Sequence, residues 1–334
     1  MADVSYVPYH TRPDWGGTAA NVDIHVEEYE GLIDRSFQYD SLFRSMGLTT
    51  FKSVEGASNT YRLNRMGGAV VKGRTSGVAL DPTRIVNEKL VISVDTVSYV
   101  RTPIDFQDQW TAPDYTAEHS GEHGIAHAKA FDQAHIIQLI KAGAWTAPAS
   151  LKASGAFFDG ISKTLTGYAA ATDQEVKADL IERGHRAAIT DFVNRDLGDS
   201  VGEFVTLMKP EWFSTMMDHK KLMNVSFVGG DVGNQMARRR MGELNGVRVY
   251  ETPRFPSGAI ASHFLGSAFN VTAAEAKAGM VLYHPGKTLV TVEATGMNFK
   301  QWEDNKEFAN VLDSYTMYNV GLRRGDACAV VFSD

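Results

Sequence analysis

The clearest chemical pattern in this sequence is a row of four histidines between residues 117 and 143. His119, His123, His127 and His135 are separated by multiples of four residues. Because residues four apart lie on the same face of an α-helix, a helix here would present all four imidazoles along one stripe. Imidazole nitrogens bind zinc and related ions, so a metal site is the first chemistry to consider.

The residues around this row do not fit a zinc-dependent hydrolase. Such an enzyme uses the motif H-E-x-x-H, in which the glutamate follows the first histidine and acts as the general base. Here Gly124 follows His123, whereas Glu122 precedes it. We therefore expect these histidines to serve packing and partly solvated surface, with no metal site. A metalloenzyme using His119, His123 and His127 is kept as a remote alternative.

Other motifs that could indicate catalysis lack the necessary context. The triplet "GKT" at residues 286–288 resembles the end of a phosphate-binding loop, but Val281 stands where that motif needs its first glycine. The segment after it is typical of a strand, and the phosphate-binding motif requires a helix there. No nucleophile elbow or spaced catalytic pair stands out. The sequence therefore predicts no catalytic residue and no cofactor.

Composition limits the function further. The 334 residues are 43% hydrophobic and 22% charged, with a net charge of -7, which is ordinary for a globular protein and unsuited to gripping nucleic acid over its whole surface. Cys328 is the only cysteine, so neither an intrachain disulfide nor a cysteine zinc cluster can form. We expect a protein without a membrane-spanning segment or an export signal, because no apolar run has the length for either.

Charge is distributed unevenly near the amino terminus. Residues 1–46 contain eight acidic and three basic side chains, whereas residues 47–89 contain seven basic and three acidic ones. The first segment includes a predicted helix that Asn21 can cap. The two oppositely charged segments could pair with each other or with copies on neighbouring chains.

The basic segment predicts a long two-stranded ribbon. Tyr61 and Leu63 alternate with Arg62 and Asn64, and a glycine-rich stretch separates this strand from a returning one. A two-stranded ribbon is marginally stable alone in water. We therefore expect it to lie on another surface, most simply on a partner subunit.

The remaining sequence predicts a mixed α and β body. The histidine row falls in a helix expected from Asp114 or Thr116 to Gly143, about 40 Å long at 1.5 Å per residue. Residues 144–171 are expected to form a small-residue connection. Thr172 is expected to cap the next helix, and strands are expected at "EFVTLM", "NGVRVYETP", "MVLYH", "KTLVTVEA" and "ACAVVF".

The order of these elements resembles the tailed-phage major capsid proteins with the Hong Kong 97 type of fold, an α+β fold. The resemblance is carried by the acidic helix, the glycine-tipped ribbon, the return strand "EKLVISVDTVSYVRTPI" and the long helix from "YTAEHSGEHGIAHAKAFDQAHI". Later segments add to it: "FVTLMKPEWFSTMMDHKKLMN", "LNGVRVYETPRFP" and the ending "YNVGLRRGDACAVVF". It covers nearly the whole chain from about residue 21, and is most similar to the podovirus branch.

The resemblance implies a division of the chain into named parts. These are an N-arm at residues 1–46, an extended E-loop at 47–90, a peripheral domain at 91–167 with its spine helix at 114–143, an axial domain at 168–285, and return strands of the peripheral domain at 286–334. The charge reversal suggests a contact between subunits. The residues expected there are Arg62, Arg65, Lys72 and Arg74 on the ribbon and Glu27, Glu28 and Glu30 on a neighbour.

The function implied is structural. The subunit would assemble through pentamers and hexamers, in the host cytoplasm, into the icosahedral shell of a virion that encloses double-stranded DNA without sequence-specific binding. Scaffolding, portal and decoration proteins are the partners implied. An encapsulin-type compartment, which carries protein cargo within a similar shell, is the principal alternative.

Overall fold

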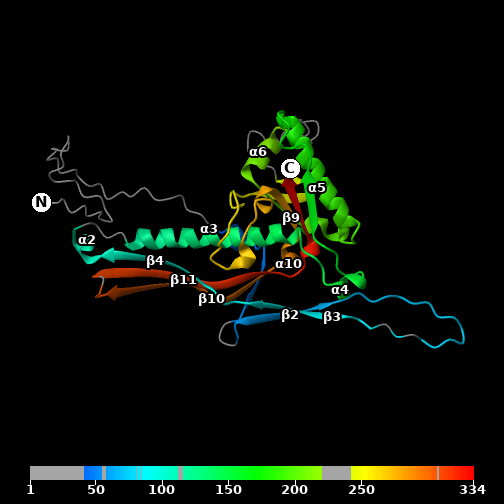
Figure 1. Ribbon diagram of the computed structural model, residues 1–334, viewed down its shortest axis with the longest axis horizontal. Coiled ribbons are helices and arrows are strands. Elements are labelled where there is room, and N and C mark those ends of the chain that lie inside the picture. Colours follow the sequence, from blue (N-terminus) through cyan, green and yellow to red (C-terminus); the bar gives the residue numbers. More distant parts are fainter. Residues whose placement is uncertain are drawn as a thin grey trace. The chain divides into compact units, whose positions relative to one another are not determined.

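The computed structural model describes residues 41–54, 58–80, 82, 84–111, 116–219, 242–306 and 308–334 (Figure 1). The predicted amino-terminal helix, most of the predicted N-arm and the three glutamates proposed for the subunit contact lie outside these ranges. Among the helices described, none is long and apolar enough to cross a membrane.

The described chain divides into two compact units. The smaller unit contains residues 97–128 and 297–316, and the larger unit contains residues 41–96, 129–296 and 317–334. Helix α3 (Thr116–Ala142) and strands β10 (Leu289–Asp304) and β11 (Ala309–Leu322) each contribute residues to both units. Helix α3 confirms the long helix predicted at residues 114–143, since its two ends lie within two residues of the predicted ones.

A four-stranded sheet has the strand order β1-β10-β11-β4. Strand β1 (Thr50–Ser53) pairs in parallel with residues 290–293 of β10, and β4 spans Val97–Asp105. Short helices precede β1 and follow β4, namely α1 (Leu42–Ser45) and α2 (Phe106–Thr111). The buried carboxylate of Asp132 on α3 fixes α1, because it accepts hydrogen bonds from the Ser41 hydroxyl at 2.5 Å and the Leu42 amide at 2.7 Å.

The larger unit is built around a six-stranded sheet with the order β5-β12-β9-β6-β8-β7. Its strands are β5 (Ile161–Leu165), β6 (Val205–Met208), β7 (Glu243–Leu244), β8 (Val247–Glu251), β9 (Ala278–Tyr283) and β12 (Cys328–Ser333). Every residue of β9 is buried. Such a continuous apolar strand requires cover on both faces of the sheet.

Helices supply that cover on both faces. Val281 and Tyr283 of β9 pack in the core that contains the buried end of α3, whereas Met280 packs with residues of α5 (Gln174–Val193) and α6 (Pro210–Met217). In Figure 1, α5 and α6 lie on the opposite side of β9 from the carboxyl-terminal part of α3. The short helix α10 (Pro285–Thr288) joins β9 to β10.

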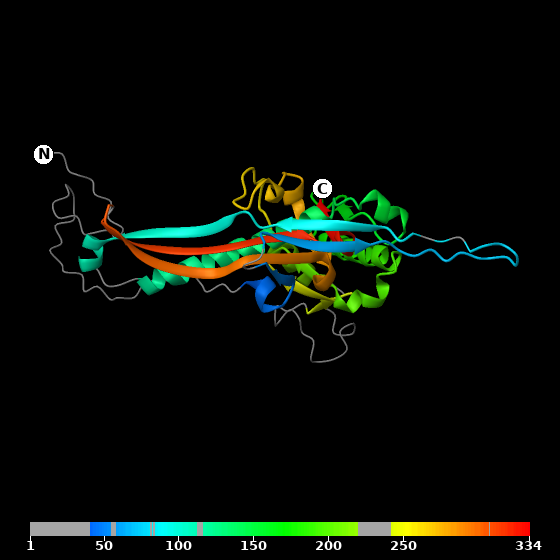
Figure 2. The same cartoon turned by 90° about the horizontal axis from the view of Figure 1, so that it is seen from below.

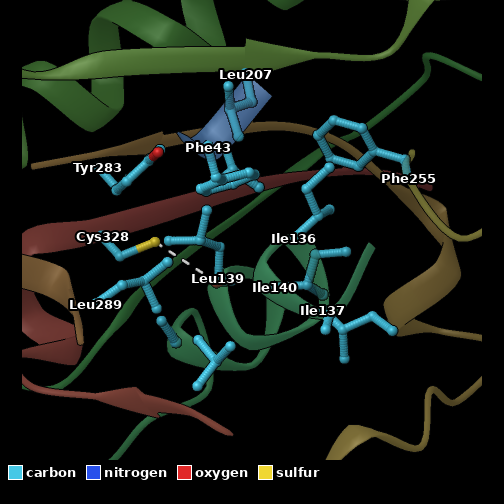
Figure 3. Close-up of a cluster of buried hydrophobic side chains, with 14 of the residues drawn as sticks. Phe43, Ile136, Ile137, Leu139, Ile140, Leu207, Phe255, Tyr283, Leu289 and Cys328 are labelled. Carbon is cyan, nitrogen blue, oxygen red and sulfur yellow. Dashed lines mark hydrogen bonds between the residues drawn. The ribbon is translucent and has the colours of Figure 1, made fainter. Parts of the chain in front are cut away.

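The core between α3 and this sheet is shown in Figure 3. It gathers Ile136, Ile137 and Ile140 from α3 with Leu207 of β6 and other apolar side chains. The thiol of Cys328 is fully buried, and it donates a 3.5 Å hydrogen bond to a carbonyl of α3. This cysteine is therefore part of the packing, and burial raises the pKa of its thiol.

Several local predictions require correction. Residues 144–171, expected as a connection, contain helix α4 (Ala149–Ala153) and strand β5. The cap of α5 is Asp173, whose carboxylate accepts from the Glu175 amide, one residue after the predicted Thr172.

Candidate functional site

The ribbon expected from the sequence is present. Strand β2 (Thr60–Met66) pairs antiparallel with β3 (Asn87–Ser93), in a register that runs from Thr60 opposite Ser93 to Met66 opposite Asn87. These two strands form a sheet of their own. We refer to them as the ribbon, and to residues 67–86 between them as the ribbon loop.

The ribbon loop presents apolar side chains to solvent. Every described residue from 69 to 85 is exposed, including Val71 at 98% and Leu80 at 78%. Figures 1 and 2 both show this loop extending away from the rest of its unit. Several exposed apolar side chains on one projecting loop are typical of an interaction surface.

The basic residues predicted at the subunit contact are separated by the structure. Arg62 is exposed on β2, and Lys72 and Arg74 lie on the ribbon loop, where the Arg74 Nε donates to the Val78 carbonyl. Arg65 differs, because it is only 8% exposed and its guanidinium bonds to carbonyls of its own chain. Within the single subunit, the Arg65 guanidinium is therefore already bonded to its own chain, whereas Arg62 is exposed.

The alternation along β2 could have indicated where Arg65 points. Tyr61, Leu63 and Arg65 occupy one face of the strand because side chains alternate between faces, and the first two are the aromatic and aliphatic residues of that face. An arginine on the apolar face of a strand requires acceptors within its own subunit. The sequence did not reveal those acceptors, which lie more than 250 residues away at Leu322 and Arg323.

Three of the four histidines in the row, His123, His127 and His135, are buried and hydrogen bonded. In the larger unit, His135 is fully buried between the rings of Phe43 and Phe131, with centroid distances of 4.7 and 4.2 Å. Its Nδ1 donates to the Phe131 carbonyl at 2.7 Å, and its Nε2 lies 2.7 Å from the Thr291 hydroxyl. Burial lowers the pKa of His135 from its ordinary value to about 3, so the ring is neutral at pH 7.

In the smaller unit, two histidines and two hydroxyls form a hydrogen-bonded chain. The Ser314 hydroxyl lies 3.1 Å from both His127 Nε2 and His123 Nδ1, and His123 Nε2 lies 2.8 Å from the Thr102 hydroxyl. With neutral rings, all three contacts are satisfied when the donors run in one direction along the chain. That direction is either from His127 through Ser314 and His123 to Thr102, or the reverse. Burial lowers the pKa of both imidazoles, which favours this neutral arrangement.

Most imidazole nitrogens in the row are already hydrogen bonded to protein groups and are therefore not directed at a metal ion. The nitrogens of His123 and His135 face protein partners, and His119 is partly exposed at the start of the row. No group of three or more potential ligands that could hold a metal ion is found among the residues that the structure describes. The row therefore holds α3 against its neighbouring strands within each unit.

Comparison with known proteins identifies the fold and the family. Neither protein-family models nor curated protein sequences match this chain. Among solved structures, the chain is 45% identical to one from the asymmetric unit of the bacteriophage PhiM1 mature capsid, covering 99% of both chains with a TM-score of 0.83.

Two more distant structures show the same fold. A chain of the cyanophage P-SCSP1u capsid is 14% identical, with 95% of both chains covered and a TM-score of 0.75. A chain of Mycobacterium phage Che8 is 15% identical, with 93% of this chain and 97% of that chain covered and a TM-score of 0.65. The protein thus belongs to the tailed-phage major capsid proteins with the Hong Kong 97 type of fold.

Proposed function

We propose that this major capsid protein assembles, through pentamers and hexamers, into the icosahedral head of a short-tailed bacteriophage and encloses its double-stranded DNA. The observation that carries the proposal is 45% identity to a mature phage capsid chain over 99% of both chains. The role is structural, and the protein resides in the capsid of the virion.

The ribbon loop supports the assembly step. Its exposed valines and Leu80 have no cover in a single subunit, so a second copy is the surface that can bury them. If each copy receives the loop of the next, the contact is head-to-tail, and such contacts close into rings when the rotation permits. Pentamers and hexamers are rings of this type.

The charge pattern supports a defined register in that contact. Arg62, Lys72 and Arg74 on or near the ribbon loop would face Glu27, Glu28 and Glu30 of a neighbouring subunit. Complementary charges of this kind fix orientation and speed association more than they add affinity. The contact is therefore expected to weaken at high ionic strength.

The named parts of the family provide a working division of the chain. We keep the N-arm at 1–46, the E-loop at 47–90, the peripheral domain at 91–167 and 286–334, and the axial domain at 168–285. Strand β12 pairs with β9 of the axial range on one side and with β5 on the other, so these two strands extend the sheet of that range. Scaffolding, portal and decoration proteins are the further partners proposed.

Analysing what the particles contain distinguishes a phage head from an encapsulin-type compartment. The chain would be produced together with the genes that neighbour it, and the particles would be purified and treated with nuclease. Protected double-stranded DNA of uniform length would support a phage head. Nuclease-resistant shells that contain an enzyme cargo and no DNA would favour the encapsulin-type alternative. The net charge of -7 fits a wall that confines DNA without gripping it.

A further inference from the structure

The ribbon is fixed to its own subunit along its inner half. The side chain of Ile92 on β3 packs directly over Gly321, where an added Cβ would lie 2.3 Å from the Ile92 Cδ1. The Asn319 side chain donates a 2.6 Å hydrogen bond to the Ser93 carbonyl. These contacts determine where the ribbon starts, but they lie at the end distant from the ribbon loop.

Arg65 holds the outer end of the ribbon. Its Nε donates to the Arg323 carbonyl at 3.1 Å and its Nη2 to the Leu322 carbonyl at 3.0 Å. The guanidinium also lies 5.5 Å from the centre of the Trp145 ring. The fork of an arginine fixes direction as well as distance, which a lysine ammonium does not.

The turn that accepts these bonds is itself held rigidly. Arg324 donates to both carboxylate oxygens of the fully buried Asp326, at 3.0 and 2.6 Å, and to the Ala156 carbonyl at 2.8 Å. Gly325 lies against Trp145 so closely that an added Cβ would be 2.5 Å from the ring. Arg65 therefore bonds to carbonyls whose positions are already fixed.

A second attachment holds Gly68, three residues after Arg65. Its partner is Ser154, which follows helix α4. Its hydroxyl accepts from the Gly68 amide at 3.1 Å and donates to the Leu151 carbonyl at 2.6 Å. The approach depends on glycine, because a Cβ on Gly67 would lie 2.9 Å from the Ser154 hydroxyl oxygen. Beyond Gly68 the described residues of the ribbon loop are exposed through residue 85.

We propose that Arg65 and Ser154 form a clamp that sets the direction in which the ribbon loop leaves its subunit, so that it meets a second copy in the orientation that a closed shell requires. The inference rests on the proposed assembly function and names positioning residues for it. A loop oriented before contact loses less conformational entropy on binding. The clamp lies where the ribbon loop begins. A small change in the direction of the chain at that point therefore produces a larger displacement at Val71.

The direction of the loop can be measured before assembly. Val71→Cys on the loop and Arg183→Cys on α5 give two exposed labelling positions in the larger unit, while the native Cys328 is 0% exposed and stays unlabelled. Spin labels at these positions report the distribution of the distance between them. Arg65→Ala and Ser154→Ala are each expected to broaden or shift this distribution. The control Lys89→Ala, which removes an exposed cation from β3, is expected to leave it unchanged.

The same variants without the added cysteines test the consequence for assembly. Arg65→Ala is expected to lower the yield of uniform closed shells by about tenfold. Arg65→Lys is expected to recover only part of that yield, because a lysine ammonium offers a single point of attachment. Lys89→Ala is expected to give the yield of the unaltered protein. Thermal unfolding of each variant would show whether the subunit folds. Ser154→Ala, which removes only one half-buried hydroxyl, provides the test if Arg65→Ala does not fold.

Two results would overturn the clamp. One is a distance distribution that Arg65→Ala and Ser154→Ala leave unaltered. The other is a broadened distribution combined with the normal yield of uniform shells. Failure of the unaltered chain to form shells under the same conditions would instead count against the proposed function itself, so the two failures are distinguishable.

Discussion

Single buried polar side chains make the packing of this subunit sensitive to pH. The clearest example is His135, which is neutral in the folded chain because burial opposes its charged form. Its ordinary pKa is 6.5 and its folded pKa is about 3. As pH falls from 6.5 toward 3, the unfolded chain binds a proton at this ring before the folded chain does. The free energy of unfolding therefore decreases over that range.

Replacing His135 should reduce this dependence on pH. In the unaltered subunit, each such histidine contributes a slope of about 1.4 kcal/mol per pH unit below pH 6.5. We expect His135→Gln to be less stable at pH 7 but to show a slope smaller by about that amount. Denaturant unfolding at several pH values between 4 and 7 measures both quantities. Identical slopes in the two proteins would contradict the assignment of a buried, neutral ring.

Asp132 offers a second test at a single residue. Its carboxylate is fully buried and accepts from the Ser41 hydroxyl and the Leu42 amide at the start of α1. Removing it leaves those donors without their acceptor, and we expect Asp132→Ala to lower the free energy of unfolding by about 3 kcal/mol. Asp132→Asn retains one carbonyl acceptor and should cost less. Equal losses for the two variants, by denaturant unfolding, would argue against this capping role.

At the scale of elements, the contact between β9 and α6 depends on one missing side chain. A Cβ on Gly279 of β9 would lie 2.1 Å from the Trp212 ring of α6. We expect Gly279→Ala to destabilise the subunit by about 3 kcal/mol, because neither the strand nor the ring can move freely in a filled core. Gly296→Ala is the matched control, since nothing lies within 4 Å of its Cβ position. Equal melting temperatures for the two variants would contradict the packing described.

Long elements with a regular pattern were predictable from the sequence. Helix α3 has 27 residues, and its apolar positions and flanking glycine determine its extent. The ribbon was predictable because Tyr61 and Leu63 alternate with polar residues. Helix α4 and strand β5 were missed because each has only five residues, and their structure depends on tertiary contacts such as the pairing of β5 with β12.

The candidate site was predictable only in part, because some of its contacts join residues that are far apart in the sequence. The two strands and the glycine-rich stretch between them were expected from the sequence. The clamp was not, because Arg65 meets its acceptors at Leu322 and Arg323 only once the chain has folded. Residue types and spacing carry no direct information about such distant partners.

At the scale of the whole molecule, the proposed charge contact predicts compensation between subunits. Arg62→Glu should reduce shell yield by placing like charges together, and Glu28→Lys should do the same. Combining the two changes in one chain should recover assembly, because each interface then regains an opposite pair. Light scattering at low and physiological salt measures the yield. A double variant no better than the single ones would count against this pairing.

The measurement that tests the central claim most directly is electron cryomicroscopy of particles formed by this chain, produced alone and with its neighbouring genes. The account predicts closed shells of uniform diameter. In them the ribbon loop of each subunit should lie on an adjacent copy, leave its own subunit at the Arg65 clamp, and have its exposed valines covered. Small monodisperse oligomers under both conditions, or shells whose ribbon loops touch no neighbour, would contradict it.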